Sequence, residues 1–460
     1  MPETGLDAAT PVRSANLLLD FFDRLGEAIP AIAGHVDPVR DGDAAFSPGF
    51  LLPEPDEPLR RFLSAATVRW HRLAGYGGHR LHLMDLTGNP GTGTTKTFAS
   101  LLIVARAVAY IRRYGENVTI FSPTSANKGT ALRDAVLRAI EAGLVEPEQL
   151  RVVIVAPRSC QAKLRASRLS EDPELRALNP VFLYTGPEPE HVKALGAEFV
   201  ERYGAEAGKR LDTRLWYSLE LRNYMVADAA RAFFEREALP DATARRVHAH
   251  AVSSAFGLLG YHQGRAALER AGLARPEDRP ASLLVQHLGT PDMVLNLVHG
   301  DFGRENVPAY TTAADGLYHQ SADPRFPRVT ADPGEVLDPT FYTHRPATSP
   351  AMNELIRRYG GDGIVVSLAE CVERYPLLRR LLDGTGCALP ADLRELQEWS
   401  LVMALTGVMN AVDRGLVEGA GHDIVVHGSG AYARADYRPL RYFTEVEEPG
   451  DIATALYGDR

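Results

Sequence analysis

Residues 80–115 read RLHLMDLTGNPGTGTTKTFASLLIVARAVAYIRRYG, and this stretch decides the fold class. RLHLMDL is mostly apolar and predicts a short buried strand, and GNPGTGTT supplies a glycine-rich turn. The remainder predicts a helix that ends at Gly115. Its apolar part, residues 98–111, contains Arg106 and is shorter than the ~20 residues of a membrane span, so we expect a buried helix. A strand, a turn and a helix in this order indicate an α/β protein.

The same alternation of strand, loop and helix continues along the chain. NVTIFSP predicts a second strand, TSANKGT a loop, ALRDAVLRAIEAGLV an amphipathic helix and VVIVAPR a third strand. Later strands are predicted in HAHAVSS, SLLVQHL and IVVHGSG, and a long helix in residues 393–417. Strands that alternate with helices favour mostly parallel, twisted sheets.

A chain of 460 residues is too long for one ordinary core, so we expect two α/β domains. Residues 1–80 form an N-terminal extension packed on the larger domain, residues 85–204 a smaller domain, and residues 205–460 the larger domain. A stretch at about 299–350, rich in Gly, Asp and Pro, has little periodicity and is interpreted as an insertion, either a lid or a packed loop region.

The composition excludes several classes of protein. The formal charge is -9 and no long Lys/Arg run occurs, so nucleic acid is not an expected partner. Three scattered cysteines do not suggest a disulfide framework or a thiolate metal site. The N-terminus has acid where a signal peptide carries base, so we expect no export signal, no membrane association and a cytoplasmic location.

Lys96 follows the glycine-rich turn and begins the predicted helix. The positive end of the helix dipole disfavours an ammonium ion and lowers the pKa of a lysine placed there. A lysine with more neutral amine is suited to forming a Schiff base. The alternative interpretation is a solvated lysine in a first helical turn.

The segment NPGTGTTK, which ends at Lys96, resembles the Asn-Pro-Thr-Gly-Ser-Phe-Lys segment of threonine synthase relatives. These belong to the fold-type II group of pyridoxal-phosphate-dependent enzymes, together with cysteine synthase and the tryptophan synthase β subunit. The match contains one extra residue, and Thr97 stands where the family usually has aspartate. The resemblance implies that Lys96 is the catalytic residue and binds the cofactor, pyridoxal 5′-phosphate.

The loop of residues 124–130 is similar to the family's Ser-x-Gly-Asn-x-Gly turn. The resemblance implies that Asn127 contacts the 3′ oxygen of the cofactor, and that the substrate carboxylate binds at Thr124, Ser125, Ala126 and Lys128. Backbone N–H groups at a helix N-terminus suit such an anion. Ala126 replaces the usual glycine. A helix-capping turn is the alternative interpretation.

Two further loops resemble cofactor-binding segments of the family. One takes the place of the loop that holds the cofactor phosphate, with some expected glycines replaced, and consists of Ser253, Ser254, Ala255, Phe256 and Gly257. The other ends the last strand, where the family places a hydroxyl against the pyridine nitrogen. Ser429 is our first choice there and His427 the second, although His427 could simply be a histidine at a strand end.

The resemblance implies a lyase or transferase that catalyses β- or γ-elimination or replacement on an amino-acid substrate, in a primary or specialised pathway, and a homodimer. One alternative is a P-loop-like nucleotide-binding protein, because residues 88–95 follow a strand in the Walker A spacing. Thr94 stands in place of the phosphate-binding lysine of that motif. Another alternative is a binding or regulatory protein that kept the cofactor fold without its chemistry.

Overall fold

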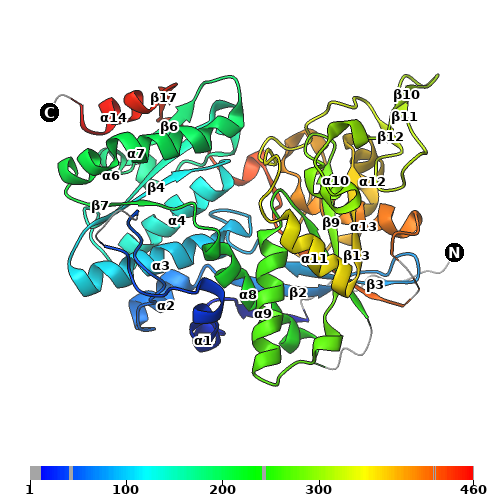
Figure 1. Ribbon diagram of the computed structural model, residues 1–460, viewed down its shortest axis with the longest axis horizontal. Helices are drawn as coiled ribbons and strands as arrows, with labels where there is room; N and C mark the ends of the chain where they lie inside the picture. The colour runs from blue at the N-terminus through cyan, green and yellow to red at the C-terminus, as the bar shows by residue number, and fades with distance from the viewer. Residues whose placement is uncertain (1–11, 41–44, 241–244, 418, 420, 459–460) are drawn as a thin grey trace.

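The computed structural model describes residues 12–40, 45–240, 245–417, 419 and 421–458. Within this part of the chain, two extensive sheets lie side by side with helices around them (Figure 1). The predicted α/β class with mostly parallel sheets is confirmed. The first eleven residues, which form part of the segment examined for an export signal, lie outside the described residues.

The large sheet, at the right in Figure 1, has seven described strands in the order β1-β2-β3-β15-β8-β9-β13. Strands β3, β15, β8, β9 and β13 are mutually parallel, and β1 and β2 extend the edge at β3 in antiparallel pairs. Their bounds are β1 Arg13–Asn16, β2 Thr67–Arg72, β3 Arg80–Asp85, β15 Asp423–Gly428, β8 Arg246–Ala251, β9 Ala281–His287 and β13 Gly361–Val366. The segment before residue 80 therefore supplies edge strands to the larger unit.

The small sheet, at the left in Figure 1, has five described strands in the order β17-β6-β5-β4-β7, all of them parallel. Their bounds are β17 Thr444–Val446, β6 Val181–Tyr184, β5 Leu150–Pro157, β4 Val118–Pro123 and β7 Arg214–Tyr217. The chain enters this sheet at β4 and returns to it with β17 near its C-terminus. No single cut in the sequence separates the two sheets.

The helices cover these sheets and connect them. The longer ones are α1 Phe22–Ala33, α3 Lys96–Tyr114, α4 Asn127–Glu141, α7 Val192–Arg210, α8 Arg222–Ala238, α9 Phe256–Arg270, α11 Ser349–Tyr359, α12 Leu368–Leu381 and α13 Ser400–Asp413. The shorter ones are α2 Glu57–Leu63, α5 Arg168–Glu171, α6 Pro173–Leu178, α10 Asp292–His299 and α14 Pro449–Tyr457. No helix of the described residues has the length and apolar character needed to cross a membrane.

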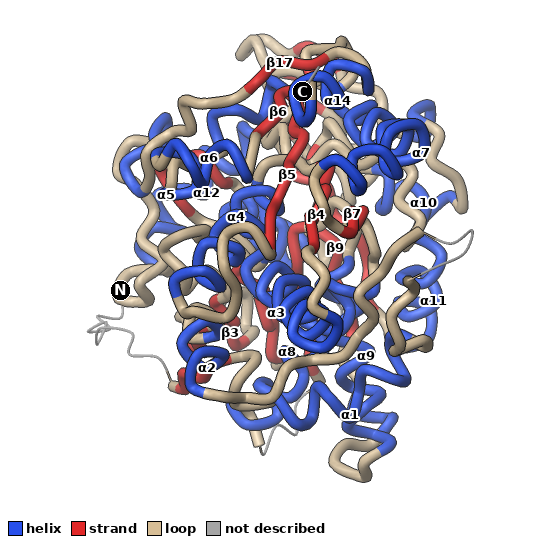
Figure 2. The backbone as a smooth tube through the Cα atoms, turned by 90° about the vertical axis from the view of Figure 1, so that its left-hand side faces the viewer, coloured by secondary structure: helices blue, strands red, loops and turns tan. Residues whose placement is uncertain are grey.

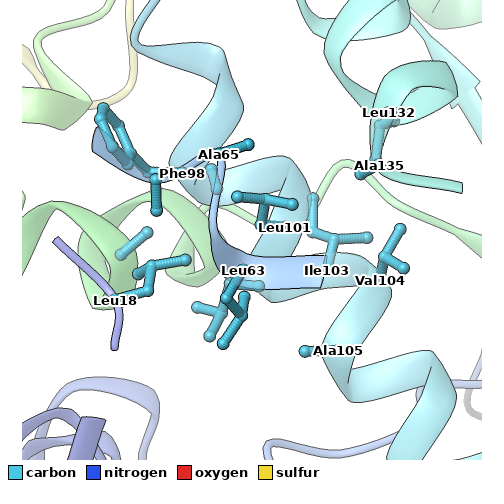
Figure 3. Close-up of a cluster of buried hydrophobic side chains, with 14 of the residues drawn as sticks. Leu18, Leu63, Ala65, Phe98, Leu101, Ile103, Val104, Ala105, Leu132 and Ala135 are labelled. Carbon is cyan, nitrogen blue, oxygen red and sulfur yellow. The ribbon is translucent and has the colours of Figure 1, made fainter. Parts of the chain in front are cut away.

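Helix α3 connects the two halves of the molecule, because it packs against α4 on one side and α8 on the other. Figure 2 shows it in front of the strands, between these two helices. Its side chains are buried on nearly every face, as the apolar segment predicted. Figure 3 shows them in one cluster with residues of α4 and of the N-terminal segment. Arg106, fully buried, donates hydrogen bonds to the carbonyl of Gly49 and to Asn223.

Strands β3 and β4 are consecutive in the chain but lie in different sheets. The structure corrects one detail of the sequence analysis. The predicted helix at 393–417 begins only at Ser400, because β14 (Leu396–Glu398) pairs instead with β16 (Tyr432–Ala433). Such pairing between distant segments overrides local helix preference.

The predicted insertion forms a small sheet of β10 (Thr311–Thr312), β11 (Tyr318–His319) and β12 (Val329–Thr330), and then a loop that reaches the space between the two sheets.

Candidate active site between the two sheets

A cavity of about 340 Å³ lies where the carboxyl ends of strands from both sheets face each other. Its walls include the residues that follow β3, β4, β8 and β15. Ligands of open α/β sheets bind in this position. The sequence-predicted residues on the wall are Lys96, Thr124, Ser125, Asn127, Lys128, Ser253, Ser254, Ala255, Phe256, Gly257 and Ser429. Ala126 and His427 are buried beside the cavity and do not line it.

Lys96 is the first residue of α3 and lies half-buried on the cavity wall. Its Nζ lies 5.0 Å from the ring centroid of Tyr224. Burial lowers the pKa of Lys96, and the positive charge of Arg231 lowers it further, whereas Asp228 and Glu398 raise it. The net effect favours the neutral amine that the sequence analysis expected.

The backbone amides of residues 91–97 are all hydrogen-bonded within the protein. Those of Gly91, Thr92 and Gly93 donate to Asn89, and that of Thr95 donates to the carbonyl of Ser429 at 2.8 Å. A P-loop instead leaves successive amides free to surround phosphate oxygens. The loop therefore fixes the start of α3 and does not form a phosphate-binding nest.

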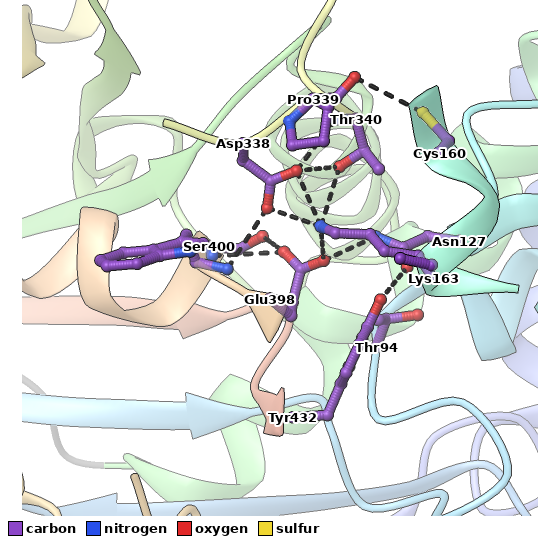
Figure 4. A network of polar contacts seen from close by, with 12 residues as sticks. Thr94, Asn127, Cys160, Lys163, Asp338, Pro339, Thr340, Glu398, Ser400 and Tyr432 are labelled. Carbon is purple, nitrogen blue, oxygen red and sulfur yellow. Dashed lines mark hydrogen bonds and ion pairs between the residues drawn. The ribbon is translucent and has the colours of Figure 1, made fainter. Parts of the chain in front are cut away.

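Asn127, the first residue of α4, has partners at both ends of its side-chain amide. Its Nδ2 donates to Glu398 Oε2 at 2.7 Å, and its Oδ1 accepts from the hydroxyl of Tyr432 at 2.7 Å. Glu398 Oε2 also accepts from Lys163 Nζ at 3.0 Å, and Lys163 donates to both oxygens of Asp338, at 2.6 and 2.7 Å. Figure 4 shows this network, which joins α4, the segment after β5, the insertion and β14.

The turn between β8 and α9 leaves polar groups without protein partners. Ser253 Oγ and His250 Nε2 are inaccessible and have no hydrogen-bond partner among the described residues. Both residues line the cavity beside the N-terminus of α9. A Cβ atom on Gly257 would lie 2.6 Å from Arg231 Nη1 and 2.9 Å from His250 Nε2, so a side chain here would displace one of these residues. His250 Nδ1 donates to the carbonyl of Ala251 at 2.6 Å, so Nε2 of this neutral histidine is an acceptor. The hydroxyl of Ser253 can donate to a phosphate bound at the helix N-terminus.

Ser429 follows β15, and its side chain reaches the cavity wall. His427 lies behind that wall: its Nδ1 accepts from Arg231 Nη1 at 3.1 Å, and its Nε2 contacts His248 Nδ1 at 2.8 Å. His248 Nε2 in turn contacts Glu235 Oε1 at 3.0 Å. Burial holds the pKa of His427 well below its ordinary value. Of the two candidates, only Ser429 is placed to meet a ligand.

The sequence analysis missed the contribution of α8. Tyr224, Asp228 and Arg231 all line the cavity, and Arg231 Nη2 pairs with Asp228 Oδ1 at 2.6 Å and donates to Thr95 Oγ1 at 2.6 Å. Their spacings of four and three residues put them on one helical face. Charged residues on the buried face of an otherwise alanine-rich helix were the signal that could have identified them. Other cavity residues that the sequence analysis missed are Lys193, His250, Tyr342 and Glu398.

Comparison with known proteins gives a family and a fold. The model of DUF6002, described as a family of unknown function, matches residues 13–458. No curated protein matches the sequence. The pyridoxal-phosphate-bound threonine synthase from Brucella melitensis is 12% identical with a TM-score of 0.50, and the alignment covers 95% of this chain and 85% of that one. An L-serine ammonia-lyase from Rhizomucor miehei is 14% identical with a TM-score of 0.49, covering 78% and 90%. The likeness to the threonine synthase shows that this chain has the same fold.

Proposed function

The chain belongs to the DUF6002 family, and we propose that it is a pyridoxal-phosphate-dependent enzyme that acts on an amino acid by elimination or replacement at the β or γ carbon. The observation that carries the proposal is the convergence of three elements on one cavity. These are a lysine with a lowered pKa at the start of α3, a helix N-terminus with unpartnered polar groups at α9, and a hydroxyl at the end of β15.

The described residues fit the cofactor. Lys96 would hold it covalently, and the N-terminus of α9 with Ser253 would hold its phosphate. Ser429 would face the pyridine nitrogen. Asn127 keeps one N–H of its amide for the ring's 3′ oxygen, because the other N–H donates to Glu398. When bound, pyridoxal phosphate supplies an electron sink for bonds broken at the α carbon.

The side chains around Lys96 control its proton. With the cofactor and an amino acid bound, the amine of Lys96 on the cavity wall would serve as the general base that accepts the α proton. The surrounding apolar wall and the neighbouring Arg231 favour the neutral form of this amine, while Asp228 stabilises the protonated form that follows. A neutral hydroxyl at Ser429 would leave the pyridine nitrogen of the cofactor unprotonated, which would favour elimination and replacement over transamination.

The test is the visible absorbance of the purified protein. We expect a band from lysine-bound cofactor in the wild type, its loss in Lys96→Ala with the far-UV circular dichroism unchanged, and its retention in Lys209→Ala, a matched variant of an exposed lysine on α7. Borohydride reduction followed by peptide mass spectrometry should place the cofactor on the peptide that contains Lys96.

Two outcomes would overturn the proposal. An unchanged band in Lys96→Ala, or tight ATP binding by a colourless protein, would exclude Lys96 as the cofactor lysine. A band that no amino acid perturbs would favour a protein that binds the cofactor without catalysis.

A further inference from the structure

Besides Lys96, two lysines line the cavity, Lys128 and Lys193. Among the described residues, both lack the carboxylate partners that the buried Lys163 has. Lys163 lies between Asp338 and Glu398, with ion pairs of 2.6 and 3.0 Å. In the part of the chain that the structure describes, no carboxylate lies within ion-pair distance of Lys128 or Lys193. Lys128 is buried and Lys193 is half-buried. Cations withdrawn from water are ordinarily paired, so these two positions are suited to an anion supplied by a ligand.

Lys128 is almost fully buried on the first turn of α4. Its Nζ donates to the carbonyl of Ser218 at 2.7 Å and to the hydroxyl of Ser218 at 3.4 Å, which leaves one N–H of an ammonium for a ligand. Burial, together with the positive charges of Lys96 and Lys193, lowers the pKa of Lys128 to about 7. The three lysines are therefore close enough to repel one another, and an anion among them would relieve this repulsion.

Lys193 lies near the start of α7, on a different helix from the cavity residues of α4 and α9, and contacts the insertion. Its Nζ lies 3.5 Å from Thr343 Oγ1 and 5.2 Å from the ring centroid of Tyr342. All three side chains line the cavity. Burial lowers the pKa of Lys193, and the more distant Glu190 raises it.

The other anionic groups expected in the cavity have separate positions. The phosphate of the cofactor fits the N-terminus of α9, and the α-carboxylate of an amino acid fits the N-terminus of α4 with its hydroxyl-bearing loop. Lys193 is on α7 and belongs to neither of these helix N-termini. Its cation would therefore remain for the side chain of the substrate.

We infer that Lys193 binds an anionic group on the substrate's side chain, so that the substrate is an amino acid with a side-chain carboxylate or phosphate. This inference rests on the proposed function, because the cofactor and the α-carboxylate fix the orientation of the substrate. Thr343 adds a hydroxyl donor to the same subsite.

The experiment is a spectral titration of the holoenzyme with matched amino acids. L-Aspartate and L-glutamate are compared with their uncharged amides, L-asparagine and L-glutamine. O-Phospho-L-serine is compared with L-serine. We expect the anionic member of at least one pair to bind about tenfold to a hundredfold more tightly, the effect of a charge-assisted hydrogen bond. The carboxylate and phosphate pairs distinguish the two sources of charge.

Variants of Lys193 test whether this residue causes the preference for anionic amino acids. Lys193→Gln should keep the cofactor band and the affinity for the uncharged member of each pair but lose the preference for the anionic one, and Lys193→Arg should retain most of it. Lys209→Gln, on the last turn of the same helix and exposed, serves as the matched control and should behave as the wild type.

A second measurement separates this inference from the proposed function. Ligand-induced shifts of the thermal midpoint report binding even if the protein has no visible band. A band with equal affinities within every pair, or a preference unchanged in Lys193→Gln, would overturn the anionic subsite and leave the cofactor proposal standing. A colourless protein that aspartate or phosphoserine stabilises only when Lys193 is present would support the subsite and overturn the cofactor.

Discussion

Ala126 has a backbone conformation, φ 80° and ψ −55°, that is rare for a residue with a side chain. The resembling loops carry glycine at this position, which adopts positive φ without strain. The side chain of Ala126 is fully buried, and the turn brings Asn127 to the start of α4. Strain of this kind is held in place by surrounding structure and often lies at functional sites.

The effect of a substitution at Ala126 on the free energy of unfolding should depend on the shape of the new side chain. Ala126→Val should lower the free energy of unfolding by at least about 2 kcal/mol, because a β-branched side chain disfavours positive φ and finds no space here. Ala126→Gly should stay within about 1 kcal/mol of the wild type, since relief of strain offsets the loss of a methyl contact and the added freedom of the unfolded chain. Urea unfolding measures both. Similar losses in the two variants would mean that the turn has another conformation.

Asn127→Ala should affect ligand binding more than it affects the cofactor. The substitution removes the hydrogen bonds to Glu398 and Tyr432 and any bond to the ligand, so we expect amino-acid affinity to fall about tenfold to a hundredfold with the visible band retained. Tyr432→Phe is the matched control, because it removes one partner of Asn127 and leaves the amide itself. Wild-type affinity in Asn127→Ala would show that the loop caps α4 and does not bind the amino acid.

At the scale of elements, the loop of the insertion is held to the small-sheet side of the molecule by one buried ion pair. Asp338 accepts from Lys163, from the backbone amide of Thr340 at 2.9 Å and from its hydroxyl at 2.7 Å. The next residues, including Phe341 and Tyr342, form part of the cavity wall. The ion pair therefore fixes the position of the wall that faces the substrate.

Asp338→Asn should loosen this wall. Loss of the carboxylate leaves Lys163 with Glu398 alone, and breaking a buried pair costs about 3–5 kcal/mol. We expect faster hydrogen exchange in residues 338–347 and weaker amino-acid binding. Asp315→Asn, in an exposed turn of the insertion, is the control. Unchanged exchange at 338–347 would show that packing alone holds the loop.

At the scale of the whole molecule, the two sheets meet across a cavity while α3 packs against helices of both halves. Buried neutral histidines lie throughout the large-sheet half. Burial lowers the pKa of His287 to about 4 and that of His262 to about 3. His287 Nδ1 accepts from the amide of Gly289 at 3.1 Å, so protonation at this nitrogen would break a hydrogen bond.

This burial predicts acid sensitivity in a definite pH window. Between about pH 4 and 6.5 the unfolded chain binds a proton at His287 that the folded protein does not bind, so stability falls as the pH falls through this range and is constant above it. The shift corresponds to about 3 kcal/mol at His287. His287→Gln should flatten the dependence, and His299→Gln, at an exposed histidine, should not. If stability depended on pH with the same slope in both variants, the titrating group would be a residue other than His287.

The sequence by itself determined the local elements and the candidate site residues. The pattern of apolar runs interrupted by glycine-rich turns predicted the strands, the end of α3 at Gly115, and Lys96 at its start. Asn127, Ser253 and Ser429 were candidates because their loops resemble those of a known family, and all three line the cavity.

Only the tertiary structure decided which of these residues share a cavity and which partners they have. Strand order, the assignment of β3 and β4 to different sheets, and the return of β17 to the small sheet depend on contacts between distant segments. The pairing of Lys163 with Asp338, 175 residues away, leaves no periodic signal in the sequence. The physical reason is that hydrogen bonds and charge pairing act over a few ångströms in space, whereas periodicity reports only neighbours along the chain.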